Sequence, residues 1–380
     1  MPGSKVRIWK QDPSVRNAGV RTAYISTHVD HGPQDADIAI RGMPHVIGNT
    51  DNDFLFDPTE NPIEFDAVHT FAVVRQVLTM FRRALNRNGI TQNFDWQWAE
   101  DAPIDVYPRA GLDANAYYSR GLKSLRFFYF HPGGNEALPL VYTCRSFDIV
   151  AHEVGHAVLD SLRPGYWNSW HPQTGGLHEA FGDITAILTM LAQMDQCEAI
   201  IAHSKGDLHV KSFFPAVAEQ FGEALHGRTT GLRNADNDLK LSEVSTQVHA
   251  ISQVFTGAFY DTLADIFEDY HKPDQYDQAE TLFRVGKHMT ALILLALLDG
   301  PEQNATYADI ASKMIEIEPV DRWKEFIHKE FTYREVFGGA AGLAEVKPQT
   351  VELKGCCGTL CGSEYSDAVQ ESIERAMKKS

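Results

Sequence analysis

The segment His152-Glu153-Val154-Gly155-His156 constrains the fold of this chain more than any other part of the sequence. In an α-helix, residues four positions apart lie one above the other, so the two imidazoles would point to the same place. Apolar residues recur at helical spacing on both sides of the segment, which predicts a helix from Phe147 to Leu162. Ser146 is its expected N-cap, and Pro164-Gly165 follows its end.

Two imidazoles in this arrangement can bind zinc, and the intervening Glu153 would lie beside the open position of the metal. With 16 His in the chain, the motif alone is only moderately specific. Zinc needs a third protein ligand, and Glu179 in a second predicted helix from Gly176 to Met194 would complete a His152, His156, Glu179 set. The fourth position would be left for water.

Asp183 lies four residues after Glu179, on the same face of the second predicted helix. Such a pair of acids is more often solvated surface, but the apolar residues around it predict a buried helix, where unpaired carboxylates would be costly. We therefore expect Asp183 to accept a hydrogen bond from the far nitrogen of a metal-binding His and so to fix its tautomer.

The remaining pattern predicts an α+β fold. A long helix is expected at residues 65–85, strands at 115–118 and 125–130, and further helices at 245–267, 278–298 and 305–317. This divides the chain into a β-rich N-terminal lobe at residues 1–145, a helical zinc-site lobe at 146–338 and a C-terminal extension at 339–380.

The formal net charge of −17 argues against nucleic acid or an anionic membrane as a partner, because both attract clustered Lys and Arg. The longest apolar run, Ala291 to Leu298, is too short to span a bilayer. Five Cys do not form a disulfide scaffold. The first residues lack the apolar core of a secretory signal, so a cytoplasmic location or a non-standard route of secretion is expected.

The two zinc-ligand segments together resemble the thermolysin-type neutral zinc metalloproteases, a gluzincin family that pairs H-E-x-x-H with G-x-x-N-E-x-x-x-D. The similarity covers about residues 50–335. Further similar segments are Asn115-Ala116-Tyr117-Tyr118, which matches the family's substrate-binding edge strand, Leu232-Arg233, which matches a pair beside a substrate pocket, and Val248-His249-Ala250-Ile251-Ser252.

The resemblance implies a two-lobe fold with the active-site cleft between the lobes, one catalytic Zn²⁺, and cleavage of a peptide or protein on the amino side of apolar residues. Glu153 would be the general base. His249 would stabilise the oxyanion, with Tyr166 as a second donor, although Tyr142 and Trp167 stay open for that role. A lone His on an apolar helix is usually a core residue, and only the surrounding similarity favours catalysis for His249.

Several positions depart from the family. His178 replaces an Asn that contacts substrate in the family, and Ile251 replaces another Asn. Val244 stands where an Asp usually orients the catalytic His, with Glu243 as a possible substitute. Asp148 is retained but Met190 replaces an acidic residue of the calcium cluster, so no structural calcium is expected there.

The sequence leaves the substrate, the oligomeric state and the control of activity without a pro-segment undecided. Cys356, Cys357 and Cys361 could form a metal-binding, redox or inhibitory element, or a flexible tail of reduced thiols. Two alternatives to a general endopeptidase are a zinc hydrolase of the same fold with one narrow peptide or biosynthetic substrate, and a pseudoenzyme that binds peptides along the Asn115 strand without cutting them.

Overall fold

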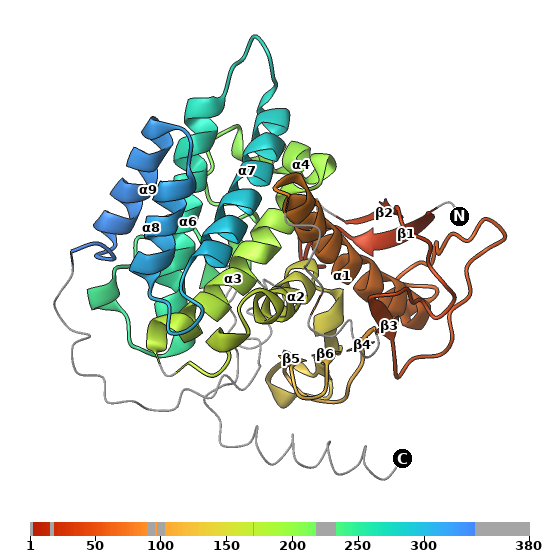
Figure 1. Ribbon diagram of the computed structural model, residues 1–380. Helices are drawn as coiled ribbons and strands as arrows, with labels where there is room; N and C mark the ends of the chain where they lie inside the picture. Colours follow the sequence, from red (N-terminus) through yellow and green to blue (C-terminus); the bar gives the residue numbers. More distant parts are fainter. Residues whose placement is uncertain are drawn as a thin grey trace.

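The computed structural model describes residues 3–15, 19–89, 96, 103–169, 171–217 and 233–338. It is a mixed helix and sheet structure, in which most of the described strands lie to one side of the long central helices (Figure 1). The α-helices are α1 (Pro62–Arg87), α2 (Phe147–Leu162), α3 (Pro172–Leu191), α4 (Met194–Ser204), α6 (Val248–Tyr270), α7 (Gln278–Asp299), α8 (Tyr307–Ile317) and α9 (Asp321–Tyr333). The strands are β1 (Ser4–Trp9), β2 (Val20–Ile25), β3 (Ile38–Ile40), β4 (Ile104–Tyr107), β5 (Ala116–Ser119), β6 (Ser124–Phe127), β7 (Tyr129–Phe130), β8 (Val141–Tyr142), β9 (Ala216–Val217) and β10 (Arg233–Asn234).

The largest described sheet has four strands in the order β3-β4-β6-β5. Strands β3, β4 and β6 are parallel, whereas β5 runs antiparallel to β6, with Ala116 opposite Phe127. Among the described strands, β5 pairs on one side only, so it is the edge of this sheet. The other sheets have two strands each: β1 with β2, β7 with β8, and β9 with β10.

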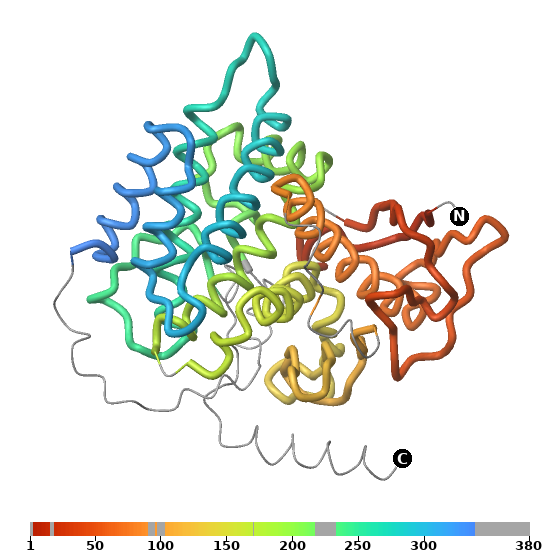
Figure 2. The backbone as a smooth tube through the Cα atoms, in the orientation of Figure 1, coloured from red at the N-terminus to blue at the C-terminus, as the bar shows by residue number. Residues whose placement is uncertain are grey.

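Helix α1 joins the strands to the helical part of the chain. Pro62 begins it, where a missing N–H costs nothing, and nearly all of its apolar side chains are buried. Phe81 stacks on Phe181 of α3 with ring centroids 5.4 Å apart. Figure 2 follows the chain from the N-terminal strands, through α1 and the central α2 and α3, to α8 and α9.

One hydrophobic core runs through the described residues, from Val6 in β1 and Ile104 in β4 to Phe255 in α6 and Met314 in α8. Each large apolar side chain buried in it contributes about 1.5–3 kcal/mol relative to exposure. The core therefore fixes the strands and the helices as one body around α2 and α3. The predicted domain boundaries stay predictions.

Helix α7 is long and apolar enough to cross a membrane, but 61% of its apolar stretch is buried inside the protein. Helices α3 and α4 would also qualify if taken together, although the chain bends by 96° between them. Buried core helices of globular proteins share these properties, so they are weak evidence for a membrane span.

The predicted helices lie close to the observed ones, with differences at their ends. Helix α2 has the predicted bounds, α3 begins at Pro172 instead of Gly176, and α4 and α9 were not predicted. The Cys356 cluster and Leu232 lie outside the described residues. Cys144 and Cys197 are buried free thiols.

Candidate metal centre

Helix α2 brings His152 and His156 together as the four-residue spacing predicts. Their Nε2 atoms lie 3.1 Å apart, and the rings meet edge to face with centroids 4.8 Å apart. Both side chains are buried. Because a neutral imidazole carries one N–H and one lone pair, two Nε2 atoms facing each other inside the protein suit a shared cation.

Helix α3 supplies the carboxylate of Glu179. Its Oε2 lies 3.6 Å from His152 Nε2 and its Oε1 lies 3.6 Å from His156 Nε2. The three ligand atoms all lie within 4.8 Å of one another. Zinc ligands at 2.0–2.2 Å from a tetrahedral centre are about 3.3–3.6 Å apart. Two imidazoles and one carboxylate at 3.1–3.6 Å therefore form a candidate site for a divalent metal ion, and a zinc ion is one that imidazole and carboxylate ligands bind.

The contact between α2 and α3 depends on Gly182. A Cβ at this position would lie 2.6 Å from Cε1 and Nδ1 of the His152 ring, which is closer than side chains approach each other. The absence of a side chain lets α3 lie directly against the imidazole. Sequence spacing gave no sign of this requirement, because it arises between two helices.

Asp183 fixes the orientation of His152. Its Oδ1 lies 2.9 Å from His152 Nδ1, and the carboxylate also accepts two hydrogen bonds from the Arg233 guanidinium at 2.7 and 2.8 Å. With Nδ1 engaged in this way, Nε2 is directed toward the metal-binding side. Arg233 thus contacts Asp183 inside the protein, whereas the resemblance had suggested a place beside a substrate pocket.

The charges of this group depend on one another. Burial lowers the pKa of His152, but hydrogen bonds to Asp183 and Glu179 outweigh it and raise that pKa to about 10. Burial also raises the pKa of Glu179, but the His249 and His156 imidazoles and the hydrogen bond with His152 hold that pKa well below its usual value. His156 has a pKa well below its usual value, chiefly because it is buried.

Glu153 is buried beside this group and is held by the edge strand. Its Oε2 accepts a hydrogen bond of 3.0 Å from the backbone N–H of Tyr118 in β5. The Tyr118 hydroxyl donates to Asp160 of α2 at 2.9 Å, and Arg120 lies 3.4 Å from the same carboxylate oxygen. Tyr118 therefore ties β5 to α2 twice, through its backbone N–H to Glu153 and through its hydroxyl to Asp160. These two hydrogen bonds fix the position of the Glu153 carboxylate.

The side chains of the predicted substrate-binding strand are used within the protein. Asn115 Oδ1 accepts a hydrogen bond from the Ala116 N–H at 2.9 Å. The Tyr117 ring packs on Phe128 with centroids 5.6 Å apart. Any contact of β5 with a peptide would therefore be made through its backbone rather than through Asn115.

His249 in α6 lies at the metal-binding group. Its Nδ1 is 2.8 Å from Glu179 Oε2, although neither ring nitrogen makes a well-directed hydrogen bond with a described residue. Glu243, the possible substitute for the orienting Asp, instead accepts the Lys240 backbone N–H at 2.9 Å. Glu179 is thus the carboxylate beside His249, and the expectation for Glu243 is wrong.

The structure does not bring Tyr166 into the site. The side chain is buried and its hydroxyl donates to the Pro301 carbonyl at 2.8 Å. Burial also raises its pKa to about 12. The single hydroxyl proton of Tyr166 is therefore already donated to Pro301. The structure contradicts the predicted role of Tyr166 as an oxyanion donor and gives it a structural role at the Pro301 loop. Tyr142 packs against the guanidinium groups of Arg109 and Arg145.

Two aromatic contacts beside the site were not foreseen. The Trp167 ring meets Tyr118 and His178 edge to face, with centroids 5.6 Å apart in both pairs. His178 is buried and its Nδ1 lies 3.4 Å from Nδ1 of His156. Burial lowers the pKa of His178 to about 4, so it is neutral. The sequence marked His178 only as a departure from the family.

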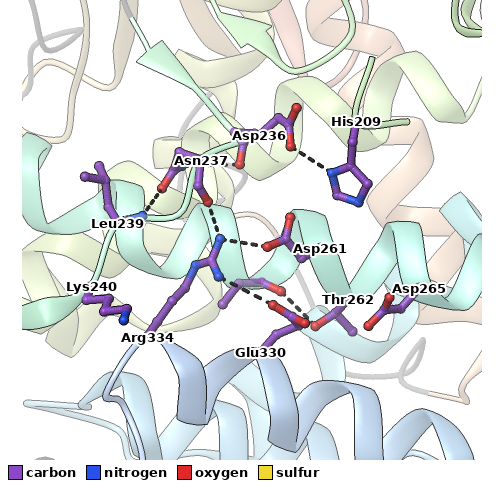
Figure 3. Close-up of polar contacts among 12 residues, drawn as sticks. His209, Asp236, Asn237, Leu239, Lys240, Asp261, Thr262, Asp265, Glu330 and Arg334 are labelled. Atoms are coloured by element: carbon purple, nitrogen blue, oxygen red, sulfur yellow. Dashed lines mark hydrogen bonds and ion pairs between the residues drawn. The ribbon is translucent and has the colours of Figure 1, made fainter. Parts of the chain in front are cut away.

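A second group of possible metal ligands lies elsewhere, at His209, Asp236 and Asp261 (Figure 3). His209 Nδ1 lies 2.9 Å from Asp236 Oδ1, and Asp261 pairs with the buried Arg334 guanidinium at 2.8 Å. Each acid of the group already has an imidazole or a guanidinium beside it. We interpret it as an ion-pair network that ties α9 to α6.

At the calcium position of the family, Asp148 is buried beside the Ser146 hydroxyl, and Met190 is buried in α3. The absence of calcium there stays a prediction.

A scan against protein-family models and a search of curated proteins found no match. Among solved structures, the chain is similar to the precursor of protealysin, a metalloproteinase from Serratia proteamaculans. The sequences are 14% identical, the TM-score is 0.44, and the match covers 70% of this chain and 78% of that one. Similarity at this level is too weak to assign a family, so function has to be inferred from the side chains themselves.

Proposed function

We propose that the chain is a zinc-dependent metalloendopeptidase. The observation that carries the proposal is the packing of α2 against α3, which gathers His152, His156 and Glu179 with their facing atoms 3.1–3.6 Å apart, close to the separations of tetrahedral zinc ligands. Glu153, a buried carboxylate on the same helix, is held in place by the Tyr118 backbone. We further propose the two-lobe architecture of the thermolysin type, with the cleft running along β5.

His152, His156 and Glu179 would hold the zinc. When bound, zinc acts as a Lewis acid that polarises a peptide carbonyl and brings the pKa of water toward about 7. Glu153 takes a proton from the water that attacks the carbonyl carbon, and delivers it to the amine nitrogen as the C–N bond breaks. His249 is placed beside Glu179 to donate to the oxygen that becomes negatively charged.

The position of β5 at the edge of the described four-stranded sheet supports a peptide as the substrate. An extended peptide can add to an unpaired strand edge through backbone hydrogen bonds. The Tyr118 N–H is already used by Glu153, so the peptide would use other backbone groups of the strand. Cleavage on the amino side of apolar residues is part of the proposal and rests on the family resemblance alone.

Glu153→Gln tests the role of the base. The substitution keeps the size of the side chain and its acceptor for the Tyr118 N–H, but the amide cannot take a proton. We expect unchanged zinc content and a loss of peptide hydrolysis of about 10²-fold or more. Glu316→Gln, on the exposed side of α8 beside Lys313, is the matched control and should leave hydrolysis unchanged. Hydrolysis that survives in Glu153→Gln would refute the proposed role.

A narrow-substrate hydrolase is the second candidate, and the replacement of the family Asn by the buried His178 favours it. Casein and a random peptide library distinguish the two. General cleavage contradicts the narrow function, whereas a zinc-loaded protein that leaves casein intact but cleaves a few peptides contradicts the general one. A pseudoenzyme is excluded by any turnover that Glu153→Gln abolishes.

A further inference from the structure

The His156 ring has two nitrogens with different neighbours. Nε2 faces His152 and Glu179, whereas Nδ1 lies 3.4 Å from Nδ1 of His178, at the long end of a hydrogen bond. A neutral imidazole has one N–H and one lone pair. If Nε2 is the metal ligand, its lone pair is needed there, and the proton of His156 has to lie on Nδ1. His178 Nδ1 then has to be the acceptor, which places its own proton on Nε2.

The His178 ring is held in this position by two other rings. It is 1% exposed, and its Nε2 has no hydrogen-bond partner among the described residues. The Trp167 ring meets it edge to face, and the His156 ring lies at a centroid distance of 5.6 Å. His178 also directly precedes Glu179 in α3. Its backbone therefore moves together with that of a metal ligand.

We infer that His178 is a positioning residue of the metal centre, which accepts the Nδ1 proton of His156 and so directs Nε2 to the metal. This inference rests on the proposed zinc site and extends it, because the family resemblance marked His178 only as the replacement of an Asn that contacts substrate. The two histidine ligands would then be oriented differently: His152 by the charged Asp183 carboxylate and His156 by a neutral imidazole.

Two substitutions separate hydrogen bonding from packing. His178→Phe keeps a ring in contact with His156 and Trp167 but has no acceptor. His178→Asn is smaller but offers an amide oxygen to His156. Loss of a hydrogen-bond partner of a metal ligand weakens metal binding by about 10- to 100-fold. Competition with a chromophoric chelator for Zn²⁺ should therefore show such a loss for His178→Phe, and a dissociation constant within about threefold of wild type for His178→Asn.

A role in packing alone predicts the reverse order of the two variants, and that result would overturn the inference. Wild-type affinity in His178→Phe would overturn it as well, while leaving the zinc site intact. A wild-type protein that binds no zinc would overturn both the site and this inference. Tight zinc binding without peptide hydrolysis would contradict only the proposed activity.

Nuclear magnetic resonance on the zinc-loaded wild type needs no variant and decides the question if His178→Phe does not fold. Long-range ¹H–¹⁵N correlations report which ring nitrogen carries the proton. The inference predicts a proton on Nδ1 of His156 and on Nε2 of His178. A proton on Nδ1 of His178 would contradict it, because that nitrogen could not then accept from His156.

Discussion

Asp183→Asn tests how the proposed ligand His152 is oriented, without changing any of the proposed metal ligands. Asp183 is 1% exposed and its carboxylate serves two partners, His152 Nδ1 and the Arg233 guanidinium. The amide keeps the size of the side chain but not its charge. His152 and Arg233 together use both carboxylate oxygens of Asp183, but the amide of Asn has only one oxygen that can accept. Its NH₂ group would then face an N–H donor of one of these partners.

The structure sets the size of two effects. Removing one charge of a buried ion pair costs about 3–5 kcal/mol. Arg233 is itself 8% exposed, so little water reaches the guanidinium in place of the lost carboxylate. Loss of the partner of a metal-binding His lowers metal affinity by about 10- to 100-fold, or about 1.4–2.8 kcal/mol.

Two measurements check these values. Denaturant unfolding with a chelator present gives the loss of stability of the metal-free protein, and chelator competition gives the zinc dissociation constant. Asp195→Asn is the matched control, because Asp195 pairs with Lys10 at 2.9 Å but its side chain is 51% exposed. It should cost no more than about 1 kcal/mol and leave zinc affinity unchanged. Zinc affinity within twofold of wild type in Asp183→Asn would refute the orienting role of Asp183.

Three further changes test other parts of the structure. Gly182→Ala should displace the His152 ring, because the added Cβ would lie 2.6 Å from that ring. Metal analysis should then show a lower zinc content, and a normal zinc content would contradict the packing of α2 on α3. Tyr166→Phe should lose the bond to Pro301 and about 0.5–1.5 kcal/mol of stability in thermal or denaturant unfolding, with peptide hydrolysis unchanged; a large drop in kcat would restore Tyr166 to the site. Burial raises the pKa of Asp261 from 3.8 to about 7, so between these values the folded chain keeps a proton that the unfolded chain releases. Stability should therefore fall as the pH rises through that window, and Asp261→Asn should reduce the slope of unfolding free energy against pH; an unchanged slope would contradict the assignment.

Much of the helical framework could be predicted from local pattern. The bounds of α2 followed from apolar spacing between Ser146 and Pro164, although the Ser146 hydroxyl bonds to Asp12 and Asp148 instead of capping the helix backbone. The beginning of α3 was placed four residues too late. The helix begins at Pro172, and Gly176 lies inside it, where a Cβ would overlap the Tyr307 hydroxyl.

The approach of His152 and His156 could be predicted because their spacing on one helix is local information. The partners of these side chains could not. Tyr118, His178 and Arg233 take their roles from contacts between elements that only the packed core brings together. The oxyanion donor Tyr166 was inferred from a resemblance in spacing, and the loop at Pro301 captures its hydroxyl.

X-ray absorption at the zinc edge, on protein purified without chelators, tests most directly whether His152, His156 and Glu179 hold the metal. We predict one zinc per chain with nitrogen and oxygen neighbours only, at about 2.0–2.2 Å, and the outer-shell scattering of two imidazoles. A protein without zinc, or a sulfur neighbour at about 2.3 Å from any of the cysteines, would contradict it.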